Sequence, residues 1–169
     1  SALRANLEKM VEKGRVGNSL LFSGPEGVGK CLYARFLASK ILGVGYAEGH
    51  PDFHYIRPEG KLSLHTIETM RWLSNEVHMP PYSSKKKVFI IENAHSMRPE
   101  CANALLKTFE EPSLDTVIIL VTHRSESMLS TILSRCRIIK FQPVAVDDIC
   151  LFVKNKYSKD DVESRSIAT

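Results

Sequence analysis

The chain has 169 residues, of which 43% are hydrophobic, which is enough for one substantial core and the beginning of a second small domain. A net charge of +4 is too mild to argue for nucleic-acid binding on its own. The four cysteines occur singly, without a C-x-x-C pair, which argues against a zinc site and a disulfide framework. No run of 18 apolar residues and no signal-peptide pattern occurs, so we expect a cytoplasmic protein without a membrane partner.

Helices and strands are predicted to alternate along the chain. Helical spacing of apolar residues predicts helices over residues 2–13, 32–42, 99–109 and 125–133, with a further helix capped by Ser63. Short apolar runs predict buried strands over residues 20–22, 53–57, 88–91, 117–121 and 138–141. Because each crossover between parallel strands must carry a helix, this order predicts an α/β domain, a five-stranded parallel sheet flanked by helices. We expect it to span residues 1–142, followed over 143–169 by the beginning of a helical lid capped by Asp147.

A glycine-rich segment lies between the first strand and the next helix. It reads Gly24-Pro25-Glu26-Gly27-Val28-Gly29-Lys30-Cys31. Glycines let several backbone N–H groups point at one anion, the helix start adds its positive dipole end, and Lys30 can reach the outer phosphates of a nucleotide. The segment is therefore predicted to bind phosphate, the alternative being a glycine-rich turn without a ligand. At the last position, where such loops use a Ser or Thr hydroxyl to hold magnesium, the soft thiol of Cys31 is a poor ligand for that hard cation.

The strand over residues 88–91 is followed by Glu92 and Asn93, where nucleotide-hydrolysing proteins of this layout place two acidic residues. Glu92 can contact a metal ion, although it is one methylene longer than the expected Asp. Asn93 stands where a general base is expected, and an amide accepts no proton at neutral pH. Asn can still orient a water molecule, so the pattern predicts strongly impaired hydrolysis. The alternative is that both differences are harmless variation in an active enzyme.

Several other polar residues have a functional and an ordinary interpretation. Arg135 follows the last helix and can be offered to a nucleotide bound by a neighbouring subunit, or it is a solvated surface charge. The lysines at 85–87 are interpreted as a solvated strand entrance, with contact to a phosphate backbone, together with Arg137, as the alternative. His50 and His54 lack partners at metal-ligand spacing and are interpreted as loop histidines.

Three segments resemble the bacterial clamp-loader subunits of DNA polymerase III, which are members of the AAA+ superfamily, and the resemblance extends over residues 5 to 145. The segments are Gly24 to Lys30, Asn103-Ala104-Leu105-Leu106-Lys107-Thr108-Phe109-Glu110-Glu111-Pro112 and Leu133-Ser134-Arg135-Cys136. The resemblance implies an AAA+ P-loop NTPase-type fold with strand order 5-1-4-3-2. It further implies a rigid member of a pentameric loader, within the DNA polymerase holoenzyme, a nucleotidyltransferase assembly. Arg135 is then implied to act in trans on the ATP of the adjacent subunit.

Within that family, the altered acidic motif and the segment His50-Pro51-Asp52 before an aromatic strand are similar to the delta-prime subunit rather than the hydrolysing gamma or tau subunit. The partners that the resemblance implies are the gamma/tau and delta subunits and, through the assembly, the sliding clamp and primed DNA. We expect ATP or ADP to bind through the glycine-rich segment with weak or absent magnesium and little hydrolysis. The alternative is an active gamma/tau-like ATPase motor subunit.

The chain departs from the family in three places. Relatives usually carry a four-cysteine zinc module before the His-Pro-Asp segment, and this chain has only the short stretch over 43–49 there, so we expect no zinc. The lid is only begun and the C-terminal oligomerisation domain is missing, so we expect the chain to be a fragment. Thr122 and His123 stand where relatives place a polar residue that senses the γ-phosphate, and Thr122 is the candidate for that role.

Overall fold

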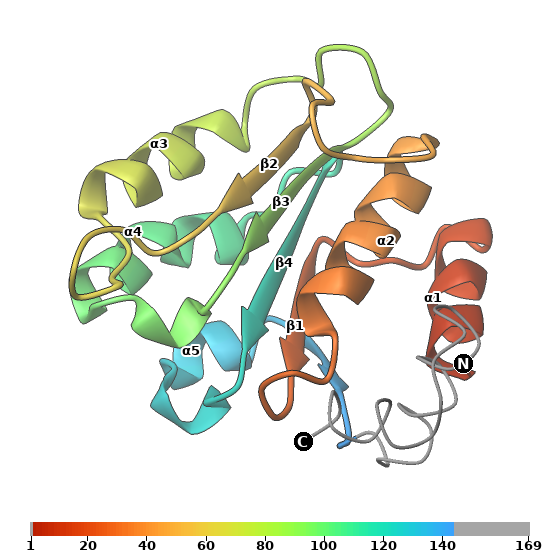
Figure 1. Cartoon of the computed structure of the whole chain (residues 1–169). Coiled ribbons are helices and arrows are strands. Elements are labelled where there is room, and N and C mark those ends of the chain that lie inside the picture. The colour runs from red at the N-terminus through yellow and green to blue at the C-terminus, as the bar shows by residue number, and fades with distance from the viewer. Residues whose placement is uncertain (1, 144–169) are drawn as a thin grey trace.

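The computed structural model describes residues 2–143 and contains a single five-stranded sheet in which every pair of neighbouring strands is parallel (Figure 1). The strands are β1 (Ser19–Ser23), β2 (Phe53–Ile56), β3 (Lys87–Ile91), β4 (Thr116–Thr122) and β5 (Arg137–Lys140). Their order across the sheet is β2-β3-β4-β1-β5, which confirms both the parallel sheet and the strand order implied by the family resemblance. All five strands therefore end at the same edge of the sheet.

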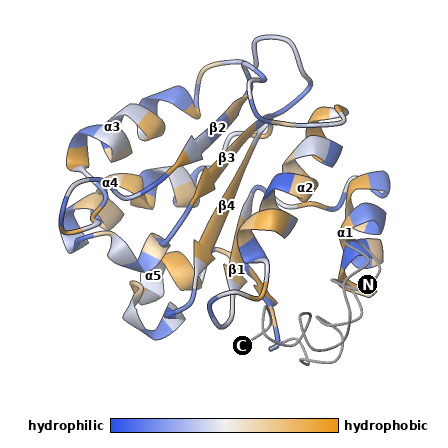
Figure 2. Cartoon of the chain, viewed as in Figure 1, coloured by the Kyte–Doolittle hydropathy of each residue, from blue (hydrophilic) through white to orange (hydrophobic). Residues whose placement is uncertain are grey.

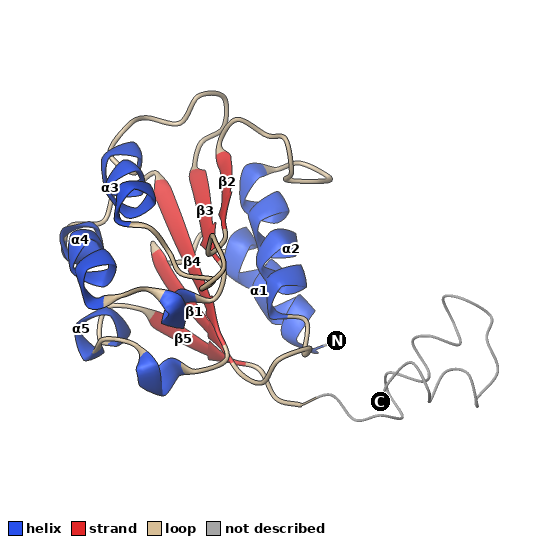
Figure 3. Cartoon of the chain, turned by 60° about the vertical axis from the view of Figure 1, so that its left-hand side comes forward, coloured by secondary structure: helices blue, strands red, loops and turns tan. Residues whose placement is uncertain are grey.

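Helices cover both faces of the sheet (Figure 3). One face carries α1 (Ala2–Glu12) and α2 (Lys30–Leu42), and the other carries α3 (Ile67–Glu76), α4 (Pro99–Glu110) and the short α5 (Ser130–Leu133). The sheet is the most hydrophobic part of the molecule (Figure 2) because its central strands are buried on both sides. In β1, for example, Leu20 and Phe22 pack with the α1 and α2 layer while Leu21 packs with the opposite layer. Among the described residues no helix is long and apolar enough to cross a membrane.

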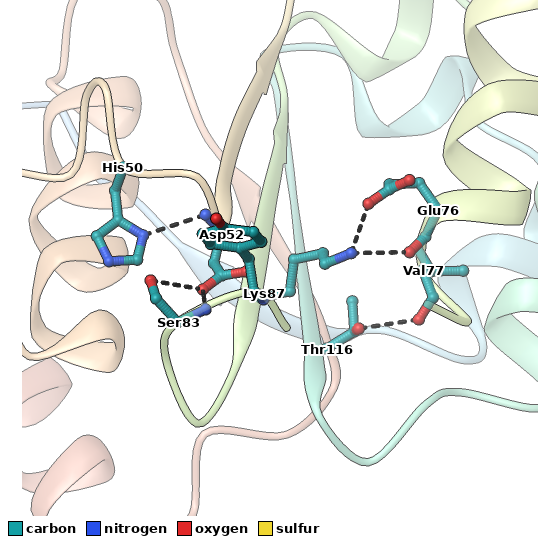
Figure 4. Close-up of polar contacts among 8 residues, drawn as sticks. His50, Asp52, Glu76, Val77, Ser83, Lys87 and Thr116 are labelled. Atoms are coloured by element: carbon teal, nitrogen blue, oxygen red, sulfur yellow. Dashed lines mark hydrogen bonds and ion pairs between the residues drawn. The ribbon is translucent and has the colours of Figure 1, made fainter. Parts of the chain in front are cut away.

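Two buried ionic groups anchor the amino-terminal end of the sheet (Figure 4). Asp52 is fully buried, and its carboxylate accepts hydrogen bonds from the backbone N–H groups of Tyr82, Ser83 and Ser84 at 2.5, 2.8 and 2.7 Å. Lys87 is 3% exposed, and its Nζ lies 2.5 Å from the carboxylate of Glu76 and 3.2 Å from the Glu76 carbonyl oxygen. Asp52 thus holds residues 82–84 of the loop over 77–86, and the Lys87–Glu76 pair joins the two residues that flank this loop.

The buried Lys87 contradicts the interpretation of residues 85–87 as a solvated strand entrance. Lys85 is exposed as predicted, but the third lysine lies inside the protein because the end of α3 brings a carboxylate and a carbonyl oxygen to its amine. A buried ammonium group is tolerated only when it is paired in this way. The lysine triplet is therefore not one continuous surface charge.

Two further local predictions are wrong. The helix α3 is capped by Thr66, whose side chain accepts a hydrogen bond from the backbone N–H of Thr69, while Ser63 lies in a left-handed turn at φ 48°. The single helix predicted over 125–133 is a 3₁₀ turn (Ser125–Ser127) followed by α5, because the chain is extended at Met128 and Leu129. The predicted cap Asp147 and the lid lie outside the described residues.

Candidate nucleotide-binding site

The carboxyl ends of β1, β3 and β4 surround a cleft of about 430 Å³. It is lined by Glu26, Gly27, Gly29, Lys30, Cys31, Leu32, Glu92, Asn93, Val121 and His123. The glycine-rich segment and the altered acidic motif, which are about 60 positions apart in the chain, thus meet in one place. A larger cavity of about 620 Å³ lies elsewhere, between the loop before α3 and the start of α4, and it includes no part of the glycine-rich loop.

The backbone of the loop requires glycine at defined positions. A Cβ atom at Gly24 would lie 2.3 Å from the carbonyl oxygen of Phe141, so no larger residue fits there. Gly27 and Gly29 have φ angles of 73° and 86°, in the left-handed region that side chains disfavour. Gly29 is the N-terminal cap of α2 and provides no side-chain cap, so the first N–H groups of this helix stay open to an anion. Within the predicted set, Val28 packs against the core and Pro25 is exposed.

Lys30 begins α2 and is 7% exposed. Its ammonium group donates a hydrogen bond to the carbonyl oxygen of Gly24 at 2.7 Å and a second one to the carbonyl oxygen of Pro25. Desolvation by burial lowers the pKa of Lys30. The lysine is therefore held against the glycine-rich loop by contacts to the backbone of that loop.

Glu92 is bonded to donors of its own chain on both carboxylate oxygens. One oxygen accepts from the Cys31 thiol at 3.6 Å, and the other accepts from the Tyr55 hydroxyl at 3.0 Å and lies 3.1 Å from Nε of Arg57. Burial raises the pKa of the Cys31 thiol, which stays neutral at physiological pH. A neutral thiol beside a carboxylate that is already paired is a poor donor set for magnesium, which requires several free oxygen ligands. These residues fit a nucleotide phosphate but not the usual magnesium ion.

Asn93 lines the cleft in a strained turn. Its φ of 50° is left-handed, a conformation that Asn tolerates better than most residues. The carbonyl oxygen of Glu92, the residue before Asn93, accepts a hydrogen bond from Nε2 of the buried His65 at 2.8 Å. This hydrogen bond holds the turn in place. Asn93 thus lies in the cleft next to Glu92, and its neutral amide cannot act as a general base.

The end of β4 contributes His123 rather than Thr122 to the cleft. Thr122 is fully buried, and its hydroxyl lies 3.0 Å from Nδ1 of His95 and accepts from the backbone N–H of Arg124 at 3.0 Å. His123 lies 3.2 Å from the carboxylate of Glu26, across the mouth of the cleft. The role of Thr122 in sensing the γ-phosphate stays a prediction. The sequence drew attention to His123 but did not indicate its contact with Glu26 of the glycine-rich loop.

Arg135 is exposed and lies away from this cleft. It precedes β5, whose first residue Arg137 pairs with Leu20 at the beginning of β1, so Arg135 lies at the edge where the strands begin. Its guanidinium donates to the carbonyl oxygen of Thr131 at 2.8 Å and to the carboxylate of Glu110 at 3.0 Å. Because the cleft is at the opposite edge, Arg135 cannot act on a ligand bound by its own loop.

Tyr55 and Arg57 are the site residues that sequence reasoning missed. Both come from the carboxyl end of β2, and the aromatic strand after His50-Pro51-Asp52 was the only sequence signal for them. The two histidines of that segment make ordinary contacts, His50 with the hydroxyl of Ser84 and His54 with the ring of Phe89. Among the described residues no group of three or more potential ligands could hold a metal ion.

Comparison with known proteins assigns a family. The family model described as "DNA polymerase III, delta subunit" matches residues 1–145. The delta' subunit of DNA polymerase III from Bacillus subtilis is 35% identical over 160 residues, which cover 84% of this chain and 48% of that protein. The delta' subunit from Pseudomonas aeruginosa is 33% identical, covering 70% of this chain and 41% of that protein, and the gamma subunit from Buchnera aphidicola is 30% identical, covering 89% and 45%. The chain therefore spans about half the length of these curated relatives.

Solved structures show the same fold. A gamma subunit-related protein of DNA polymerase III from Thermotoga maritima has a TM-score of 0.76 at 24% identity, covering 97% of this chain and 57% of that one. The RuvB Holliday junction branch migration motor from the same organism has a TM-score of 0.67 at 21% identity, covering 99% and 53%. These likenesses show that the chain shares the fold of these two proteins. Because the family match runs from the first helix through the last strand, the chain belongs to the DNA polymerase III delta' subunit family.

Proposed function

We propose that the chain is the AAA+ module of a delta' subunit of the DNA polymerase III clamp loader, which helps to load the sliding clamp on primed DNA together with gamma/tau and delta subunits. In this proposal its own cleft binds ATP or ADP and hydrolyses it poorly, while Arg135 serves an adjacent ATPase subunit. The family match and the two delta' relatives support the assignment. The observation that carries it is the cleft itself, where the phosphate loop is complete but Glu92 is paired internally and Asn93 replaces the base.

The size of the expected defect follows from the chemistry. Loss of a positioned general base typically costs about a hundred- to ten-thousand-fold in rate. The thiol of Cys31 removes a second contribution, because it does not replace the hydroxyl that holds magnesium on the phosphates. Binding uses other groups, namely the loop N–H groups, the start of α2 and Lys30, and these are all present. In this proposal the cleft therefore keeps the groups that bind a nucleotide and lacks the groups that would hydrolyse it.

The placement of Arg135 supports its proposed role. An arginine at the edge opposite to its own cleft can meet only a ligand that another molecule presents. A planar guanidinium is suited to the charge that develops on a transferring phosphoryl group, and such fingers contribute about a thousand- to a hundred-thousand-fold in rate. The ion pair with Glu110 joins two partly exposed side chains and costs little to open, because such surface pairs contribute about 0–1 kcal/mol.

The test uses the full-length subunit in a reconstituted loader and measures DNA-stimulated ATP turnover and clamp loading. Arg135→Ala is expected to abolish loading and to remove the turnover of the adjacent site. Arg71→Ala is the matched control, since this arginine is also exposed, lies on α3 and belongs neither to the cleft nor to the alternative DNA-contact residues. Turnover and loading that are equal in both variants would refute the finger assignment.

The competing function is an ATP-hydrolysing motor subunit of the gamma/tau type, which the complete glycine-rich loop and the gamma relatives favour. Lys30→Ala distinguishes the two within the same assembly. We expect total turnover to stay at the wild-type level, as for Lys40→Ala at the far end of the same helix. A loss of turnover at the subunit's own site would establish the motor instead. A third candidate, DNA binding by the lysines at 85–87 together with Arg137, is disfavoured because Lys87 is buried in an ion pair and the lysines form no continuous charged surface.

A further inference from the structure

The side chains around Glu92 form a connected charged cluster that the proposed function has not used. We define this Glu92 cluster as Cys31, Arg35, Tyr55, Arg57 and Glu92. The Tyr55 ring lies between two guanidinium groups, with Cζ of Arg35 at 4.5 Å and Cζ of Arg57 at 5.0 Å from its centroid. Of the five members, Cys31 and Glu92 line the cleft, and the ion pair with Glu92 places the guanidinium of Arg57 directly beside it.

The cluster is held together at its base. Tyr55 donates its hydroxyl hydrogen to Glu92, and burial raises the pKa of Tyr55 above its ordinary value, so the hydroxyl remains a donor. Arg35 is fixed from the other side by Glu48, whose carboxylate lies 3.1 Å from its Nε. Arg57 is thus bound through Nε to a carboxylate that is itself anchored by the tyrosine.

The positive charge of Arg57 extends beyond its contact with Glu92. Its side chain is 63% exposed, whereas that of Glu92 is 27% exposed, so the guanidinium lies on the solvent side of the pair. A guanidinium has five N–H donors in a rigid fork, and the ion pair with Glu92 is made through Nε. The remaining donors are suited to the planar oxygens of a phosphate group.

We propose that Arg57, held by Glu92 and Tyr55, supplies the counter-charge for the outer phosphates of a nucleoside di- or triphosphate in place of a divalent cation. Nucleotide binding at this cleft then requires Arg57 and does not require magnesium. The inference rests on the proposed nucleotide binding by the glycine-rich loop. It follows from the poor fit of magnesium to this donor set, because the Glu92 carboxylate is already in contact with Cys31, Tyr55 and Arg57, and the Cys31 thiol is a poor ligand for a hard cation.

Calorimetric titration of the full-length protein with ADP and with ATP, in EDTA and in excess magnesium, tests the inference. The wild-type dissociation constant is expected to agree within about twofold between the two buffers. Arg57→Ala is expected to weaken binding in EDTA by about tenfold or more, the loss of one charge-assisted contact, and magnesium is expected to restore part of it because Glu92 then lacks its cationic partner. Arg57→Lys keeps the positive charge but lacks the forked N–H donors of a guanidinium. Its affinity in EDTA is expected to lie between those of the wild type and Arg57→Ala.

Arg71→Ala is the matched control, since Arg71 is an exposed arginine on α3 that lines the separate cavity of about 620 Å³, whereas Arg57 is paired with Glu92 of the nucleotide cleft. Unfolding temperatures equal to that of the wild type show that each variant is folded. Two results would overturn the inference and leave the proposed nucleotide binding intact. One is wild-type binding that is at least tenfold tighter in magnesium than in EDTA. The other is an Arg57→Ala variant that binds as tightly as Arg71→Ala in EDTA. Absence of wild-type binding in both buffers would overturn it together with the proposed nucleotide binding.

Discussion

Substitution of Asp52 by Asn provides a sharp test of the buried carboxylate that fastens the loop before β3 (Figure 4). The carboxylate accepts three backbone N–H bonds from residues 82–84 and a weaker bond from the Ser83 hydroxyl at 3.3 Å. Hydrogen bonds to a charged group contribute about 1.5–3 kcal/mol each, but they are not additive, and the loop N–H groups can be rehydrated when the contact is lost. We therefore expect Asp52→Asn to lower the free energy of unfolding by about 2–4 kcal/mol.

The pH dependence of this effect has a definite sign. Burial by itself raises the pKa of Asp52, but the backbone N–H groups of Tyr82, Ser83 and Ser84 outweigh it and lower the pKa below its ordinary value of 3.8. The carboxylate thus stabilises the folded state fully above the unfolded pKa and loses its contribution as the pH falls through the folded pKa. The difference between wild type and Asp52→Asn is expected to be constant from neutral pH to about pH 5 and to narrow below about pH 4.

The assay is urea-induced unfolding of the chain across this pH range, with hydrogen exchange of the amides of residues 82–84 as a local measurement. Asp115→Asn is the matched control, because Asp115 is an exposed aspartate in the loop that leads into β4 and its substitution is expected to change stability by less than about 0.5 kcal/mol. A loss no larger than that of the control, or a difference from wild type that widens in acid, would refute the role assigned to the carboxylate.

The remaining predictions concern single residues and are measured by equilibrium unfolding, with nucleotide titration for the first. Gly24→Ala is expected to lose about 2 kcal/mol or more and to weaken ADP binding, because its Cβ would meet the Phe141 carbonyl oxygen; unchanged affinity would contradict the loop geometry. Lys87→Ala is expected to cost about 1.5–3 kcal/mol by removing its contacts with Glu76, whereas Lys85→Ala changes stability by less than about 0.5 kcal/mol; equal effects would show that both lysines are solvated. Thr66→Ala is expected to cost about 1 kcal/mol, and the capping assignment fails if Ser63→Ala costs as much.

The sequence by itself determined the features that depend on neighbouring residues. Runs such as Val88-Phe89-Ile90-Ile91 identify a strand buried on both faces, and their alternation with helices allows only a parallel sheet covered on both sides. The loop from Gly24 to Lys30 was also predictable, because left-handed turns and an open helix start require glycine at fixed spacing. The wrong cap prediction for α3 arises because Ser63 and Thr66 are both suitable N-terminal caps when only neighbouring residues are considered. The packing of α3 determines which of them caps the helix.

The tertiary structure alone decided which side chains meet. Glu92 is paired with residues 31, 55 and 57, Lys87 with Glu76, and Asp52 with residues 82–84, and none of these pairs has a spacing that a helix or strand pattern encodes. Each pair forms because the fold brings segments that are distant in the sequence together at an end of the strands, and the buried charges of Asp52 and Lys87 require partners there. For the same reason, only the fold shows that Arg135 lies at the edge opposite to the cleft, too far away to act on a ligand held there.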